Sequence, residues 1–203
     1  MAGRTMNIPV LRPLLGLMLA ALPLSLSGCG GPGDTPPPLA DARIGGPFTL
    51  VDQDGKVTKD SDFAGKYRLI YFGYTFCPDV CPVDVQTIMK GYKLLGERNP
   101  GLAARLQPIF ITVDPERDTP AALRAYTNAF PGLVALTGRP DQIAAVAKAF
   151  AVYYKKVPDR SMGYKMDHSR AAMLFGPKGE PLALVAQDQG AEAVAKDIER
   201  WAK

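Results

Sequence analysis

Histidine and cysteine are scarce in this chain: its 203 residues include one histidine, His168, and three cysteines, Cys29, Cys77 and Cys81. Structural zinc sites usually take four Cys or His ligands. Four such residues in the whole sequence exclude a protein with several structural zinc sites built from Cys and His. Disulfides are also not required for the fold, because a domain of this length buries enough apolar surface to form a core.

The chain has no strong excess of charge of either sign. It carries 24 Lys and Arg side chains against 20 Asp and Glu, a formal net charge of +4, and the basic residues are not clustered. A nucleic-acid-binding surface would need a concentrated basic face. We therefore predict a protein that binds no nucleic acid, and we expect it to be monomeric.

The apolar run near the start of the chain, residues 14–22, is too short to cross a membrane, which takes roughly 20 residues. Arg4 and Arg12 precede it, as in a secretory signal. Leu26-Ser27-Gly28-Cys29 then resembles a bacterial lipobox. We predict that residues 1–28 are a lipoprotein signal peptide and that Cys29 is lipidated, which would anchor the protein at the periplasmic face of a bacterial membrane. The alternative is an ordinary signal peptide with a free Cys29.

The remainder divides into a tether and one domain. Residues 29–43 are rich in glycine and proline, which favours an extended linker. Domain 44–203 alternates apolar runs with helical patterns. Strands are predicted at 48–51, 56–58, 67–72, 106–113, 133–136, 171–175 and 182–186, and helices at 82–97, 120–130, 141–153 and 191–201. This order predicts an α/β, thioredoxin-like fold: a glutaredoxin-type core sheet with flanking helices, an N-terminal β-hairpin and a helical insertion.

Cys77 and Cys81 follow the strand predicted at 67–72, where a helix begins. The carboxyl ends of such strands favour functional groups, and the start of a helix stabilises a thiolate. Two thiols at this spacing can form a disulfide, exchange disulfides with a partner, or bind a metal ion. The spacing does not decide among these. It does depart from thioredoxin-like oxidoreductases, which place two residues between their thiols, because here there are three.

The single histidine lies just before the strand predicted at 171–175. In a thioredoxin-like topology, the loop entering this strand faces the cysteine pair, so we expect His168 to join Cys77 and Cys81. Two thiolates and an imidazole suit Cu(I), and the same set occurs in Cu(II) sites. We predict one copper ion per chain on these three residues. Asp114, after the strand at 106–113, is a candidate to orient a ligand without binding the metal.

Three stretches together resemble the Sco/SenC proteins: 72–82 (FGYTFCPDVCP), 113–120 (VDPERDTP) and 167–169 (DHS). The resemblance implies a thioredoxin-fold, membrane-tethered copper protein that assists the assembly of cytochrome c oxidase. It places the copper ligands on Cys77, Cys81 and His168. The implied partners are oxidase subunit II, which has a dinuclear copper site, and a periplasmic copper donor.

Two alternatives stay open. Proteins of this family can also act as thiol-disulfide reductases that keep the oxidase cysteines reduced, in which case Cys77 and Cys81 form a redox pair. The other alternative is a lipid-anchored domain in which the same two cysteines form a structural disulfide. Copper retention and the effect of reduction on stability distinguish these possibilities.

Overall fold

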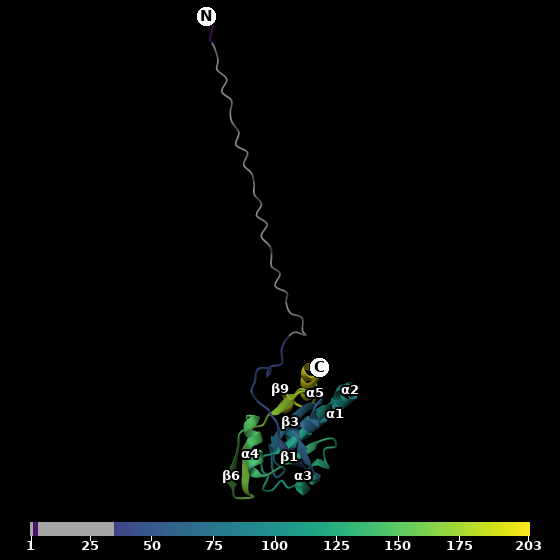
Figure 1. Cartoon of the computed structure of the whole chain (residues 1–203), viewed down its shortest axis with the longest axis vertical. Helices are drawn as coiled ribbons and strands as arrows, with labels where there is room; N and C mark the ends of the chain where they lie inside the picture. Colours follow the sequence, from purple (N-terminus) through teal and green to yellow (C-terminus); the bar gives the residue numbers. More distant parts are fainter. Residues whose placement is uncertain (1, 4–34) are drawn as a thin grey trace. The chain divides into compact units, whose positions relative to one another are not determined.

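The computed structural model describes residues 2, 3 and 35–203 (Figure 1). The predicted signal peptide and the predicted lipidation site at Cys29 lie outside these residues. Residues 36–203 form one compact unit. None of the helices described is both long enough and apolar enough to span a membrane.

A seven-stranded sheet forms the centre of the unit. Its parallel part is β5–β4–β3, and β8 and β9 continue it antiparallel on the β3 side. The predicted N-terminal hairpin extends the other edge, where β1 pairs with β5. In spatial order the strands are β2 (Val57–Lys59), β1 (Thr49–Asp52), β5 (Val134–Thr137), β4 (Leu106–Thr112), β3 (Tyr67–Gly73), β8 (Ala172–Phe175) and β9 (Pro181–Val185).

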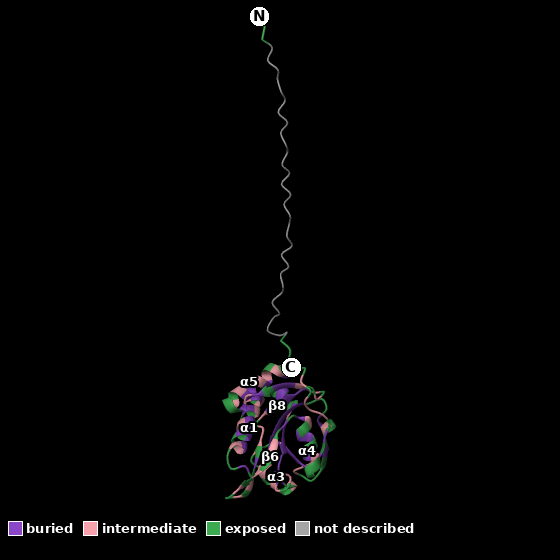
Figure 2. Cartoon of the chain, turned by 90° about the vertical axis from the view of Figure 1, so that its left-hand side faces the viewer, coloured by how far each residue is buried: buried purple, intermediate pink, exposed green. Residues whose placement is uncertain are grey.

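Helices flank this sheet, which confirms the predicted α/β, thioredoxin-like class. Figure 2 shows α1 and α5 on one side of the strands and α4 on the other, with exposed residues on their outer surfaces. The helices are α1 (Val80–Arg98), α2 (Pro100–Ala104), α3 (Pro120–Thr127), α4 (Pro140–Ala149) and α5 (Ala191–Trp201), with 3₁₀ turns η1 (Asp60–Phe63) and η2 (Gln187–Gln189).

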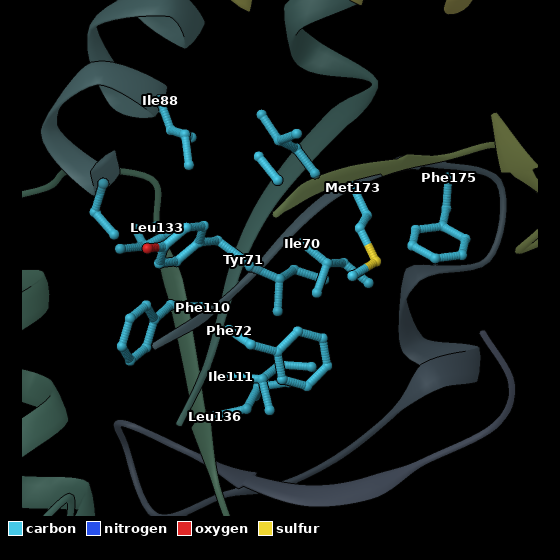
Figure 3. Packing of buried hydrophobic residues seen from close by; sticks show 14 of the residues in the cluster. Ile70, Tyr71, Phe72, Ile88, Phe110, Ile111, Leu133, Leu136, Met173 and Phe175 are labelled. Atoms are coloured by element: carbon cyan, nitrogen blue, oxygen red, sulfur yellow. The ribbon is translucent and has the colours of Figure 1, made fainter. Parts of the chain in front are cut away.

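Strand β3 lies in the middle of the core, and all seven of its residues are buried. Successive side chains of a strand point to opposite faces. Tyr71 accordingly reaches α1, where its hydroxyl donates to Asp84, whereas Phe72 packs against Phe150 at the end of α4. Figure 3 shows β3 residues beside side chains of β4, β5 and β8. A strand buried on both faces explains the largely apolar run in the sequence, in which Arg68 is the one charged residue and pairs with Asp60.

A second hairpin, β6 (Tyr154–Asp159) and β7 (Gly163–His168), was not predicted. It forms its own two-stranded sheet, separate from the seven-stranded one. The helix predicted at 141–153 ends at Ala149, and the chain then turns into β6. His168 is therefore the last residue of a strand, whereas the sequence placed it in a loop.

Helix α1 begins two residues earlier than predicted, so that Cys81 belongs to its first turn. Pro82 is then the third helical residue, where the missing N–H costs no helical hydrogen bond. Cys77 remains in the preceding loop, and the two cysteines do not lie on one continuous helical path. The helix predicted through Phe130 ends at Thr127.

The residues just before position 44 also contact the domain. The N–H of Leu39 donates to the carbonyl of Leu182 in β9 at 3.0 Å. The end of the predicted tether thus lies along the edge strand of the sheet.

Candidate metal centre

The two cysteines lie together at the carboxyl end of β3. The Cys81 N–H points to the Cys77 Sγ at 3.5 Å, and the Cys77 N–H donates to the carbonyl of Tyr74 at 3.3 Å. Both are free thiols; Cys77 is 8% exposed and Cys81 is fully buried. The turn at Tyr74–Cys77 and the first turn of α1 thus bring the two sulfurs to one place.

His168 joins this pair, as predicted. Its Nε2 lies 3.1 Å from the Cys81 Sγ, and its Nδ1 lies 2.9 Å from the carbonyl oxygen of Ser169. A carbonyl only accepts hydrogen bonds, so Nδ1 carries a proton and Nε2 is the atom presented to the sulfurs. The rings of Tyr71 and Tyr74 pack edge-on against the imidazole. The hydrogen bond from Nδ1 to the Ser169 carbonyl is the kind of contact that fixes the ring orientation of metal-binding histidines.

The two thiols differ in acidity. A hydrogen bond from the Cys81 thiol, helped by His168, lowers the pKa of Cys77 well below its ordinary value. The same hydrogen bond and complete burial raise the pKa of Cys81, and the nearby charge of Asp84 adds to this. Cys77 is therefore the sulfur that ionises first.

A groove leads from solvent to the site. Its volume is about 470 Å³, and its lining includes Cys77, His168, residues 78–80 and part of β7. Cys81 does not line it. Cys77 and His168 are therefore accessible from the groove, and Cys81 is not.

The loop before Cys77 is held by a buried carboxylate, that of Asp118. Asp118 accepts hydrogen bonds from the N–H and the hydroxyl of Thr75 and from the hydroxyl of Thr112. Burial raises the pKa of Asp118, although these hydrogen bonds act in the opposite direction. Thr119, the next residue, caps α3, its hydroxyl accepting from the N–H of Ala122. Asp118 thus has a role at the cysteine loop that its sequence context does not reveal.

Asp114 does not contact any of the three donors. Its carboxylate accepts hydrogen bonds from the hydroxyl of Tyr164 at 2.9 Å and from Nε of Arg117 at 2.5 Å. The Asp114 side chain is thus linked to the site through these two residues, whose part in the site the sequence did not indicate.

The residues brought together fit a soft metal ion. Two sulfurs and an imidazole nitrogen are soft donors, and the backing of Nδ1 by Ser169 supplies the second layer that such sites use. The donors now contact one another through hydrogen bonds. Within the part of the chain that the structure describes, no group of three or more His, Cys, Asp or Glu side chains is already arranged as a metal-binding cluster.

Known proteins are similar in sequence to this chain. The chain is 41% identical over 165 residues to the mitochondrial protein SCO2 homolog of Bos taurus, and 39% identical over 160 residues to protein SenC of Rhodobacter capsulatus. These matches cover 80% and 78% of this chain, and 61% and 71% of those proteins. The chain thus spans less than two thirds of the length of the bovine protein.

A solved structure is similar to this chain in both sequence and fold. The structure of Bradyrhizobium japonicum ScoI with copper bound is 42% identical, with a TM-score of 0.70; the match covers 78% of this chain and 99% of that one. The family model described as SCO1/SenC matches residues 36–203, which is nearly all of the part that the structure describes. The chain therefore belongs to the SCO1/SenC family.

Proposed function

We propose that this protein binds one copper ion through Cys77, Cys81 and His168. The observation that carries the proposal is the 3.1 Å contact between the only histidine of the chain and the Cys77–Cys81 pair. A relative of 42% identity was solved with copper bound, which supports copper as the metal. Soft sulfur ligands also favour Cu(I) over harder ions.

We further propose that the copper is cargo for the dinuclear copper site of cytochrome c oxidase subunit II, received from a periplasmic donor. The groove at Cys77 and His168 supports transfer, because it lets a partner's ligands approach the ion from solvent. The signal peptide and the lipid anchor at Cys29 would place the domain at the periplasmic face of a bacterial membrane. Membership of the SCO1/SenC family supports this role.

Copper retention by the full chain tests the site. Cys29→Ser, present in every variant, leaves Cys77 and Cys81 as the only thiols. The protein is titrated anaerobically with Cu(I) against a competing chelator. We expect one tightly held Cu(I) per chain, and weakening by about tenfold or more in His168→Ala. Lys155→Ala, an exposed residue of β6, is the control. Absence of binding, or equal retention by the two variants, would overturn the proposal.

Transfer is tested separately. Protein loaded with Cu(I) is mixed with the metal-free copper domain of oxidase subunit II, ferricyanide then removes one electron per dinuclear centre, and the visible absorption of the mixed-valence centre is measured. We expect the absorption to develop with the parent and to be lost with Cys81→Ser. Development at the same rate from free copper would argue against a delivery role.

A second candidate function is reduction of the oxidase cysteines. It is favoured by the unequal acidity of the two thiols, because the lowered pKa of the slightly exposed Cys77 suits attack on a disulfide. Cys81, which lies behind it, would resolve the mixed disulfide after giving up its proton, which the departing partner thiolate takes. Disulfide formation between Cys77 and Cys81 would supply the two electrons, with release of the two partner thiols.

The two functions differ in their dependence on histidine. If His168→Ala preserves oxidase assembly in cells while Cys77→Ser abolishes it, reduction is the main role. If both variants abolish assembly, and added copper restores it only for the histidine variant, delivery is the main role.

A further inference from the structure

The strand that carries His168 is not held by the central sheet. β6 and β7 hydrogen-bond only to each other as strands, yet the imidazole lies within contact of Cys81. Apart from the short connection through residues 169–171 to β8, contacts made by side chains hold the hairpin beside the cysteine loop. Alternate residues of β7 share one face, and Tyr164, Met166 and His168 form the less exposed face of this strand.

Tyr164 is the residue through which this face is held. Its hydroxyl donates to Asp114 at 2.9 Å, and its carbonyl accepts from Nη1 of Arg117 at 3.1 Å. The Arg117 guanidinium also lies over the Tyr164 ring, 3.7 Å from the ring centre. Asp114, whose side chain is 2% exposed, fixes the guanidinium through Nε.

The same guanidinium reaches the loop that leads to Cys77. It lies 5.2 Å from the ring centre of Phe76 and 5.7 Å from that of Tyr74. Its Nη2 is buried and has no hydrogen-bond partner among the described residues, so the aromatic faces are its neighbours on that side. One side chain thus contacts both the strand of His168 and the loop of Cys77.

We propose that Arg117 is a positioning residue that sets the distance between His168 and the Cys77–Cys81 pair. Arg117 does not itself hydrogen-bond to any of the three donors. It acts by holding Tyr164 in β7 and the aromatic loop 74–76 against one planar cation. The inference rests on the proposed copper site for its functional consequence, although the positioning is a property of the metal-free protein.

Lysine cannot replace this arrangement. It keeps the charge, but it lacks the planar fork that reaches Asp114 and the Tyr164 carbonyl together, and it does not stack on a ring in the same way. Arg117→Lys should therefore leave the local charge intact while loosening the hairpin. Residues that orient metal ligands typically change metal affinity by about 10–100-fold when lost.

The test uses the single histidine as a probe. Because His168 is the only histidine, its imidazole NMR signals need no assignment in untagged full chain. Arg117→Lys and Tyr164→Phe are compared with the parent, all carrying Cys29→Ser, and with Arg124→Lys, a control whose exposed ion pair with Asp54 has no contact with the site. Circular dichroism and thermal unfolding establish that each variant is folded, and Tyr164→Phe carries the test if Arg117→Lys is not.

We expect the His168 signals to shift in the metal-free Arg117→Lys protein, to a smaller extent in Tyr164→Phe, and not in Arg124→Lys. The Cu(I) dissociation constant should rise about 10–100-fold in Arg117→Lys. Parent-like His168 signals in folded Arg117→Lys and Tyr164→Phe would overturn the positioning role. Shifted signals in a protein whose parent form binds no Cu(I) would instead support positioning and refute the proposed function.

Discussion

The Nε2 atom of His168 lies 3.1 Å from the Sγ of Cys81, although 87 residues separate them in the chain. On its other side, the ring donates from Nδ1 to the carbonyl of the next residue, Ser169, at 2.9 Å. The β6–β7 hairpin therefore places the imidazole beside the cysteines. The hydrogen bond to the Ser169 carbonyl determines that Nε2 is the nitrogen that faces them.

This geometry predicts the tautomer of the neutral ring. When the ring is neutral, ¹⁵N NMR of the metal-free full chain should show His168 protonated at Nδ1 and bare at Nε2. Added Cu(I) should move the Nε2 signal and leave the proton on Nδ1. The urea-unfolded chain, which lacks the Ser169 contact, is the reference. A folded protein with its proton on Nε2 would contradict the assignment.

The unequal acidity of the thiols predicts selective alkylation. Because the Cys81 thiol lowers the pKa of Cys77, iodoacetamide should modify Cys77 in acidic buffer, while Cys81 stays unmodified. The sign follows from the shift: a lowered pKa keeps the reactive thiolate populated as the pH falls. Cys81→Ala removes the donor, so the pKa of Cys77 should rise and its alkylation at about pH 6 should slow on the order of tenfold. Mass spectrometry of peptides measures both sites.

Alkylation of Cys77 that is equally fast in the parent and in Cys81→Ala at that pH would remove the Cys81 thiol as the cause. His168→Ala is a useful companion variant, since the imidazole is a smaller contributor to the low pKa of Cys77. It should slow alkylation less than Cys81→Ala does.

A buried ion pair beside the cysteines supports the fold. The Asp84 side chain, 2% exposed, accepts from the hydroxyl of Tyr71 at 2.8 Å and from two nitrogens of Arg170 at 3.0 and 2.7 Å. Asp84→Ala leaves the Tyr71 hydroxyl without its acceptor and should lower the free energy of unfolding by about 2–3 kcal/mol. Arg170 is 45% exposed and can turn to water, so the loss stays below that of a fully buried pair.

Urea unfolding measures this loss. Asp141→Ala, which breaks the exposed pair of Arg139 and Asp141, is the matched control and should change stability little. Equal stability losses in the two variants would show that burial of Asp84 contributes nothing.

The central strands were predictable because buried strands are made mostly of apolar residues, and such runs are visible in the sequence. The run at 67–72 is apolar apart from Arg68, as expected for a strand covered on both faces, and the cysteines follow where it ends. The topology also predicted that the segment before β8 would face the cysteines. The contact of His168 with Cys81 follows from those two facts and confirms that part of the expected site geometry.

The hairpin at 154–168 was missed for a physical reason. β6 contains Lys155 and Lys156 with exposed side chains and a proline at 158, a residue that argues against a strand. The alternation in β7, with Tyr164, Met166 and His168 on the less exposed face, was the signal that could have indicated it. The contacts of Asp118 with Thr75 and of Arg117 with Tyr164 could not be predicted from sequence, because they join segments that only the fold brings together.

Two glycines of α1 predict opposite effects of the same substitution. A Cβ at Gly91 would lie 2.4 Å from Cγ1 of Val194 and 2.9 Å from the carbonyl oxygen of Ala191, because α1 and α5 pack closely there. Gly91→Ala should therefore lower the free energy of unfolding by about 1–3 kcal/mol. At Gly96 the nearest atom is 3.9 Å away, so Gly96→Ala should raise it by about 0.5–1 kcal/mol through helix propensity. Urea unfolding of both variants checks the pair; a Gly91→Ala protein as stable as Gly96→Ala would show that the two helices are not in close contact at that residue.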